Sequence, residues 1–133
     1  MIVSATWAPP LRRLARELPA AGRAIGYPRD RVGVAKVAWP APAVRAGAAA
    51  LRAVMPGRAR ALLGLSRANV LALHHALVSP AVVRAVHGSG GALFAWTVND
   101  PDRVALLAAA GVDGIVTDDP EMAVRVLATL NSP

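Results

Sequence analysis

The sequence predicts an α/β fold in which short parallel strands alternate with helices. Three dipeptides, each a Ser or Asp followed by Pro, recur about every 20 residues in the second half of the chain: Ser79-Pro80, Asp100-Pro101 and Asp119-Pro120. A capping side chain followed by a residue without a backbone N–H is typical of a helix start. The stretches between them, Ala92–Val98 and Gly114–Thr117, are rich in the Val, Ile and aromatic residues typical of buried strands. This alternation predicts a parallel sheet with right-handed crossovers.

Glycines support this pattern, because they follow the expected helices at the positions where helices commonly end. Gly88, Gly90 and Gly91 can end the helix from Pro80, and Gly111 the helix from Pro101. The first half shows the same alternation less clearly. There we expect the strands Ile2–Ser4 and Ala24–Tyr27, the helix Pro10–Leu18, a loop to Pro42, the helices Ala43–Val54 and Arg58–Leu65, and the strand Val70–His74.

The length bounds the architecture. A closed (β/α)₈ barrel takes roughly 250 residues, and this chain has 133, with its first expected strand at Ile2. About five strands are expected, so the sheet is either open or part of a larger barrel. We interpret residues 1–133 as a single partial domain, with residues 29–69 as a helical insertion.

Composition excludes several classes of protein. A hydrophobic content of 55% and a mean hydropathy of +0.43 argue against disorder. The absence of cysteine excludes disulfides and thiolate metal sites. No apolar run reaches the roughly 18 residues of a membrane span, and the first apolar residues precede Arg12 and Arg13, the reverse of a secretory signal. We therefore expect a cytoplasmic protein.

The net charge of +7 is unevenly distributed. Residues 1–67 carry twelve of the fifteen basic residues and two acids, whereas residues 68–133 carry three basic residues and six acids. A basic half can indicate nucleic-acid binding. The arginines, however, lie among Ala, Leu and Val without aromatic residues that could stack on bases, so we expect a solvated basic face and no nucleic-acid partner.

Two segments carry a resemblance to a known family. The first, Ala95–Pro101, reads AWTVNDP, and the second, Gly111–Pro120, reads GVDGIVTDDP. Together they resemble the closing signature of glycerophosphodiester phosphodiesterases, in which a Trp-Thr-Val-Asn strand end and a helix precede Gly-Val-Asp-Gly-Ile-x-Thr-Asp. Ile2-Val3-Ser4 also resembles the family's Val-Ser-Ser-Phe strand, although Ala5 replaces the second serine.

The resemblance implies the C-terminal part of a TIM barrel. It also implies an enzyme of glycerophospholipid metabolism that hydrolyses glycerophosphodiesters to glycerol 3-phosphate and an alcohol. Members use a divalent cation, calcium or magnesium, held by a Glu-x-Asp strand and a later glutamate, and catalytic histidines that include a His-Arg-Gly motif. This chain has no His-Arg-Gly, and Glu17 is followed by Leu18 and Pro19. We therefore expect no catalytic residue and no metal ligand in this chain, and no cofactor bound by it alone.

Three residues are candidates for the substrate pocket. Trp96 and Asn99 lie at a strand's C-terminal end, where barrels of this kind place their sites, and the resemblance assigns Trp96 to the pocket wall. The alternatives are a core role for Trp96 and a turn role for Asn99. His74 and His75 should point to opposite faces of their strand, so only one, taken here as His75, could reach the pocket. A structural role is the alternative for both histidines.

The remaining polar residues have simpler explanations. The carboxylates at the helix starts are expected to cap free N–H groups: Asp100, Asp102, Asp118 and Asp119. We expect a turn role for Asp113 and no chemical role for His87.

Two hypotheses about function remain open. In the first, the chain is a truncated phosphodiesterase without activity of its own. In the second, it is a non-catalytic half-barrel that dimerises, or docks on a separate N-terminal half, through exposed sheet edges.

Overall fold

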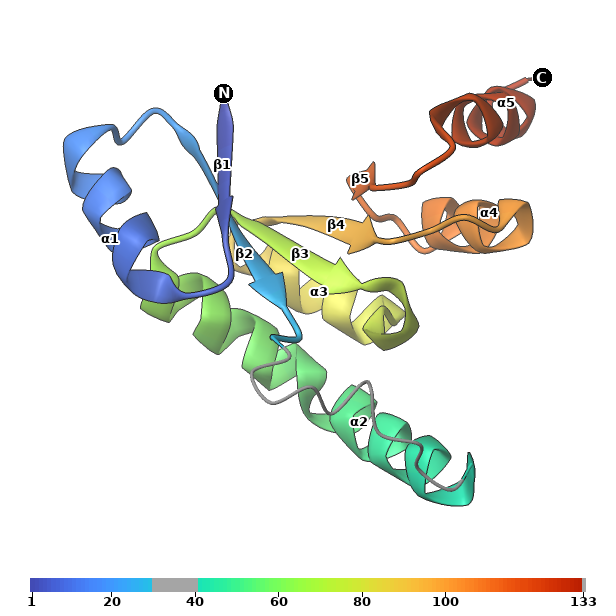
Figure 1. Cartoon of the computed structure of the whole chain (residues 1–133), viewed down its shortest axis with the longest axis horizontal. Helices are drawn as coiled ribbons and strands as arrows, with labels where there is room; N and C mark the ends of the chain where they lie inside the picture. The colour runs from blue at the N-terminus through green and yellow to red at the C-terminus, as the bar shows by residue number, and fades with distance from the viewer. Residues whose placement is uncertain (30–40, 133) are drawn as a thin grey trace.

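The computed structural model describes residues 1–29 and 41–132, which form one five-stranded parallel sheet with helices between its strands (Figure 1). The strands are β1 (Ile2–Ala5), β2 (Gly22–Tyr27), β3 (Val70–His74), β4 (Ala92–Trp96) and β5 (Gly114–Ile115). The helices are α1 (Ala8–Glu17), α2 (Ala41–Ser66), α3 (Pro80–Gly88), α4 (Pro101–Ala109) and α5 (Pro120–Leu130), with a short 3-10 turn at His75–Leu77.

The strands pair in chain order, so each crossover joins neighbours, as the alternating pattern predicted. Ser4 lies beside Ala24, and His74 beside Trp96. Within the described ranges the sheet does not close, and β1 and β5 form its two edges. This confirms an α/β fold with about five parallel strands in a sheet that does not close within the described residues.

The three predicted helix starts are confirmed by their hydrogen bonds. The Ser79 hydroxyl accepts the Val82 N–H at 3.3 Å, and an Asp100 carboxylate oxygen accepts the Arg103 N–H at 3.2 Å. An Asp119 oxygen accepts the Met122 N–H at 2.9 Å. Each cap is followed by proline at the first helical position, so side chain and backbone specify the same boundary.

The predicted break at Pro56 is wrong, because Ala41–Ser66 forms one helix with this proline inside it. A proline in a helix interior removes one hydrogen bond and opposes the helix by about 3 kcal/mol. Met55, Ala59 and Leu63 follow one another at four-residue spacing and are buried on one face. Their packing holds the helix together through Pro56. The expected loop over residues 30–40 lies outside the described residues.

Smaller differences concern strand ends. β4 ends at Trp96 and β5 at Ile115, short of the expected Val98 and Thr117. Backbone pairing nevertheless continues, since the Val98 N–H donates to the Val116 carbonyl at 2.9 Å. Gly111, at φ +87°, takes the left-handed conformation expected of a residue that ends a helix.

The helices cover one face of the sheet. Ile25, Leu71 and Leu93 are at most 3% exposed and belong to one buried cluster with side chains of α1, α2 and α3. A second cluster joins Ala95 to α4 and α5. Of the residues that alternate with these and lie on the opposite face, Ser4 is exposed, and a further set is partly buried: Gly26, Ala72, Ala92, Phe94 and Trp96. The site described below lies where this sheet ends.

Candidate functional site

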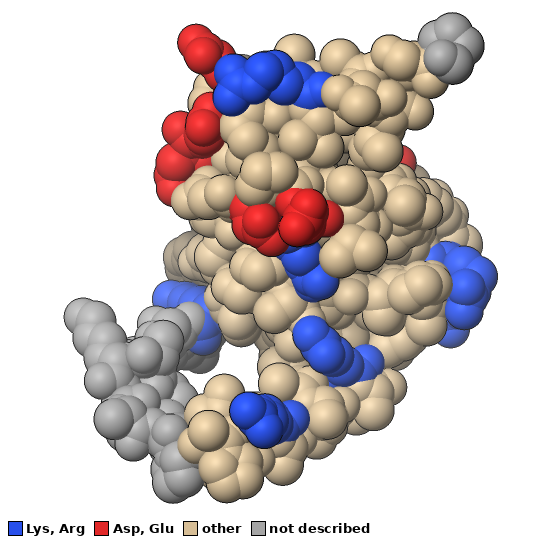
Figure 2. Space-filling model, turned by 90° about the vertical axis from the view of Figure 1, so that its right-hand side faces the viewer, with Lys and Arg blue, Asp and Glu red and all other residues tan. Residues whose placement is uncertain are grey.

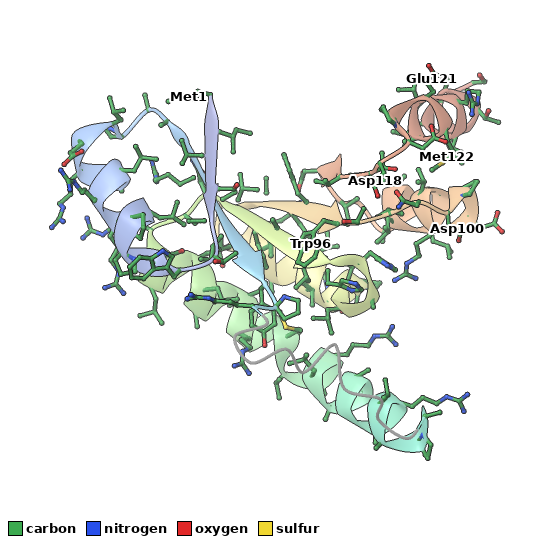
Figure 3. The ribbon with its side chains drawn as sticks, in the orientation of Figure 1. Met1, Trp96, Asp100, Asp118, Glu121 and Met122 are labelled. Carbon is green, nitrogen blue, oxygen red and sulfur yellow. The ribbon has the colours of Figure 1, made fainter. Side chains whose placement is uncertain are left out.

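The candidate site lies at the carboxyl edge of the sheet, where β3, β4 and β5 end. Trp96 closes β4, and Figure 3 labels it together with Asp100 and Asp118, which lie in the loops that follow β4 and β5. Parallel strands bring their carboxyl ends to one edge, which is where α/β proteins place their ligands. An open pocket of about 410 Å³ occupies this edge. Its lining comprises His75, Thr97, Val98, Asn99, Asp100 and Arg103.

Arg103, in the first turn of α4, is hydrogen-bonded to His75. Its Nε–H donates to His75 Nδ1 at 3.2 Å, and its Nη2 donates to the His75 carbonyl at 2.6 Å. The two bonds fix the guanidinium beside the imidazole and link α4 to the 3-10 turn that follows β3. This contact gives the pocket a fixed positive charge and a histidine of defined orientation.

The prediction that His74 and His75 point to opposite faces is wrong. Their rings stack with centroids 4.6 Å apart. The His74 ring also makes an edge-to-face contact with the Trp96 ring, with centroids 5.4 Å apart. The alternation of side chains holds only along a strand. β3 ends at His74 and the 3-10 turn begins at His75, so the change of backbone brings both rings together.

Both histidines accept a hydrogen bond at Nδ1, from the Ala76 N–H in His74 and from Arg103 in His75. An accepting nitrogen carries no proton, so each neutral ring holds its proton on Nε2. Burial lowers the pKa of His74, and the charge of Arg103 lowers it further. The pKa of His75 is lowered by burial, then by His74 and by Arg103. The pair is therefore neutral at pH 7 and offers Nε2–H donors.

Asn99 joins the loops that follow β4 and β5. Its Oδ1 accepts from the Thr117 hydroxyl and the Asp118 N–H, both at 3.0 Å, and its Nδ2 donates to an Asp118 carboxylate oxygen at 2.8 Å. These bonds agree with the alternative of a turn role, because they occupy both ends of the amide. Asn99 lines the pocket and also holds its wall in place.

The model of the glycerophosphoryl diester phosphodiesterase family matches residues 34–122, which include every residue of the pocket. The chain belongs to this family. The resemblance of the AWTVNDP and GVDGIVTDDP segments is thereby confirmed.

Related sequences support the assignment and show how much of a family member is present. A glycerophosphodiester phosphodiesterase of Arabidopsis thaliana is 35% identical over 68 residues, 51% of this chain and 21% of that protein. One of Caldanaerobacter subterraneus is 38% identical over 50 residues, 38% of this chain and 21% of that protein. The matched segments thus span about a fifth of these relatives.

Solved structures share the fold. A glycerophosphodiester phosphodiesterase from Parabacteroides distasonis superposes with a TM-score of 0.69 at 16% identity, covering 98% of this chain and 44% of that one. An Oleispira antarctica phosphodiesterase, solved in complex with the product sn-glycerol-3-phosphate, superposes with a TM-score of 0.62 at 16% identity, over 94% and 40%. The chain therefore spans less than half the length of these phosphodiesterases.

The structure brings two of the three predicted pocket residues together. His75 and Asn99 line the same pocket, whereas Trp96 contacts His74 beside it. Sequence reasoning missed Arg103, although its position gave a signal. An arginine in the first turn after a Trp-Thr-Val-Asn strand end must lie near the carboxyl edge.

The acidic residues near the site accept hydrogen bonds from helix N–H groups or from a loop side chain. Asp100 and Asp119 cap α4 and α5, and Asp118 accepts from Asn99. Within residues 1–29 and 41–132, no group of three or more His, Asp or Glu side chains could hold a metal ion. The described residues therefore do not fit the divalent cation that the family implies.

Asp113 lies away from this edge, in the turn before β5. Its Oδ2 accepts the Leu93 N–H at 2.8 Å and contacts His87 Nε2 at 2.8 Å. Burial alone would raise the pKa of Asp113, but the hydrogen bonds from Leu93 and His87 lower it. This bridge between α3, β4 and β5 agrees with the predicted turn role for Asp113.

The charge asymmetry of the sequence is visible on the surface. On the face shown in Figure 2, the acidic side chains lie in the upper half, and the lower half carries only basic ones among the coloured residues. None of the described helices combines the length and the hydrophobicity that crossing a bilayer requires.

Proposed function

We propose that this chain contributes the C-terminal strands and part of the substrate pocket of a glycerophosphodiester phosphodiesterase. The observation that carries the proposal is the family match over residues 34–122, within which the pocket at the carboxyl edge lies. The substrate class is a glycerophosphodiester, and the products are glycerol 3-phosphate and an alcohol. The product found in the Oleispira antarctica enzyme is consistent with this class.

Arg103 and His75 are suited to the phosphate of such a substrate. Arg103 uses Nε and Nη2 to hold His75, and Nη1 makes no hydrogen bond to a described residue. A guanidinium N–H and an imidazole Nε2–H are both donors for phosphate oxygens. In this proposal Trp96 forms an apolar wall near the glycerol moiety, and Asn99 holds the β4 and β5 loops in register.

We infer that the 133-residue chain alone does not hydrolyse glycerophosphodiesters. The sequence has no His-Arg-Gly or Glu-x-Asp motif, and the described side chains do not form a metal site. In this proposal the calcium or magnesium ion of the family is held by residues outside this chain. A cytoplasmic location remains part of the same proposal.

Two measurements test the proposal. Incubating the chain with glycerophosphocholine and either Ca²⁺ or Mg²⁺ should release no glycerol 3-phosphate above a protein-free blank, and metal-dependent release would contradict the inference of inactivity. NMR titration with sn-glycerol 3-phosphate should shift the His75 and Trp96 side-chain signals. Arg103→Gln should abolish these shifts, whereas Arg84→Gln, an exposed arginine on α3, should leave them unchanged.

An alternative is a non-catalytic half-barrel that pairs with another chain. It is favoured by the two unpaired edges, β1 and β5, and by the partly exposed face of the sheet. Light scattering coupled to gel filtration would show a dimer if two copies pair. A monodisperse monomer that binds no N-terminal half of a family member would reject this alternative.

A further inference from the structure

A second pocket lies between α1 and the end of α2. It shares no lining residue with the carboxyl-edge pocket. On α1, Arg12 and Arg16 are four residues apart and therefore lie on one side of the helix. The single acid of this helix, Glu17, pairs with Arg13 at 2.7 Å. Arg12 and Arg16 thus share a helix face on which no carboxylate balances their charge.

The end of α2 brings a third arginine to this face. Arg12, Arg16 and Arg67 line a pocket of about 380 Å³ together with Gly64 and Leu65. No acidic residue lines it, and Arg67 adopts a left-handed backbone at φ +53°. Three guanidinium groups around one hollow make an environment that favours an anion.

A purely structural role explains only some of these arginines. The Arg12 Nε–H donates to the Leu65 carbonyl. Nearby Arg23 donates to the carbonyls of Arg67, Pro19 and Ala21, at 2.8 to 2.9 Å. Such bonds satisfy carbonyls at helix ends and in turns. Neither the Arg16 nor the Arg67 side chain makes a hydrogen bond or ion pair with another described residue, so both are available to a ligand.

An apolar groove continues from this pocket. It has a volume of about 460 Å³, shares Arg12 and Leu65 with the basic pocket, and is lined also by Trp7, Ile25 and Leu62. Trp7 is 51% exposed and Leu65 64% exposed. Large apolar side chains left exposed beside a basic pocket suggest a ligand with two unlike ends.

We propose that this groove binds a phosphate group carried on an apolar chain. The phosphate lies among Arg12, Arg16 and Arg67, whose planar donors match phosphate oxygens. The chain lies along Trp7, Leu62 and Leu65. The site shares no residue with the carboxyl-edge pocket, so it does not depend on the proposed phosphodiesterase function.

Calorimetric titration of the 133-residue chain tests the proposal with three probes: octyl phosphate below its micelle concentration, inorganic phosphate, and octanol. Octyl phosphate should bind at least about tenfold more tightly than inorganic phosphate, because its chain buries apolar surface. Octanol should bind weakest. Equal affinities for octyl phosphate and inorganic phosphate, or no binding of octyl phosphate, would overturn the proposal.

Variants test the phosphate-binding arginines and the apolar part of the groove separately. The double variant Arg16→Gln/Arg67→Asn should weaken octyl phosphate binding by about tenfold or more, and asparagine tolerates the left-handed backbone at position 67. Arg84→Gln/Arg125→Gln removes the same charge elsewhere and should bind like the parent. Leu65→Gln should weaken octyl phosphate but leave inorganic phosphate unchanged.

Ionic strength gives a test that needs no variant. Raising NaCl from about 50 to about 500 mM should weaken binding of octyl phosphate to the parent. Added salt shortens the Debye length and so weakens the attraction between the phosphate and the arginines. Identical binding by the parent and the Arg16/Arg67 double variant, with both folded by circular dichroism, would overturn the arginine assignment.

Discussion

The last three helices and the first two are specified in different ways. Helices α3, α4 and α5 each begin at a side chain that caps the first turn and a proline that follows it. Helix α1 begins at Trp7 without a side-chain cap, and α2 passes through Pro56. Local sequence signals therefore set the helix starts in the second half, whereas packing carries α2 through a residue that local signals oppose.

The comparison shows which kind of contact can override a local signal. A cap contributes about 1 kcal/mol, and an interior proline opposes a helix by about 3 kcal/mol. Burial of Met55, Ala59 and Leu63 on both sides of Pro56 outweighs that penalty, since fully burying one such large side chain contributes about 1.5–3 kcal/mol. Three predictions test this difference, and a fourth concerns the stacked histidines.

The largest expected effect is on the packing that holds α2. Met55→Ala removes a side chain that is 0% exposed and should lower the free energy of unfolding by about 2–5 kcal/mol. The neighbouring Val54→Ala, at a residue that is 54% exposed, serves as control and should change it by less than about 0.5 kcal/mol. Urea unfolding measures both, and equal effects would contradict the packing argument.

The next effect concerns the proline itself. Pro56→Ala restores a backbone donor inside α2 and should raise the free energy of unfolding by about 1–3 kcal/mol, with unchanged helix content by circular dichroism. A matched change at a proline of the first helical turn, Pro101→Ala, should have a much smaller effect, because no donor is needed there. A lower free energy of unfolding for Pro56→Ala would contradict the claim that Pro56 opposes α2.

The side-chain caps of α3 and α5 should each contribute less to the free energy of unfolding. Asp119→Ala and Ser79→Ala should each lower the free energy of unfolding by about 1 kcal/mol, because each leaves a helix N–H without its acceptor. Thr129→Ala, at the other end of α5 and exposed, is the control. Hydrogen exchange at Val82 and Met122 would localise the loss, and protection unchanged at both would contradict the role of the caps.

The smallest effect is a pH dependence from the stacked histidines. The pKa of His74 and of His75 is lowered from the ordinary 6.5, so the unfolded chain binds more protons than the folded one just below pH 6.5. Stability should therefore fall as pH decreases through 6.5 and on toward the lowered values, and be fully present above 6.5. Urea unfolding between pH 7.5 and 5 should show a smaller fall for the double variant His74→Gln/His75→Gln.

Arg103→Gln sharpens that prediction. Removing the guanidinium charge should raise the pKa of both histidines toward 6.5, because Arg103 is one cause of each lowered value. NMR titration of the ring protons measures this directly. Unchanged histidine pKa values in Arg103→Gln would show that Arg103 does not lower them.

Much of the fold could be predicted because its signals are local. Ser79, Asp100 and Asp119 define helix starts through bonds that reach only three residues along the chain. Strand positions followed from short β-rich stretches, and the AWTVNDP and GVDGIVTDDP segments together indicated the family. The charge imbalance between the two halves was likewise readable from the sequence.

The candidate site could be predicted only in part. Trp96, Asn99 and His75 were selected by their position at strand ends, and two of them line one pocket. The partnership of Arg103 with His75 joins residues 28 positions apart, and periodicity along a strand gives no information about such a contact. The stacking of His74 on His75 depends on the 3-10 turn that begins at His75, and the correctly predicted strand end at His74 gave no information about that turn.

By itself, the sequence determined the family, the alternation of strands and helices, and the capped helix starts, because these depend on residue type and short-range bonds. The tertiary structure alone decided that α2 continues through Pro56, that His74 and His75 stack, and that Arg12 and Arg16 of α1 share one pocket with Arg67, which follows α2. In each case the deciding energy comes from contacts between segments distant in sequence, and these exist only once the chain has folded.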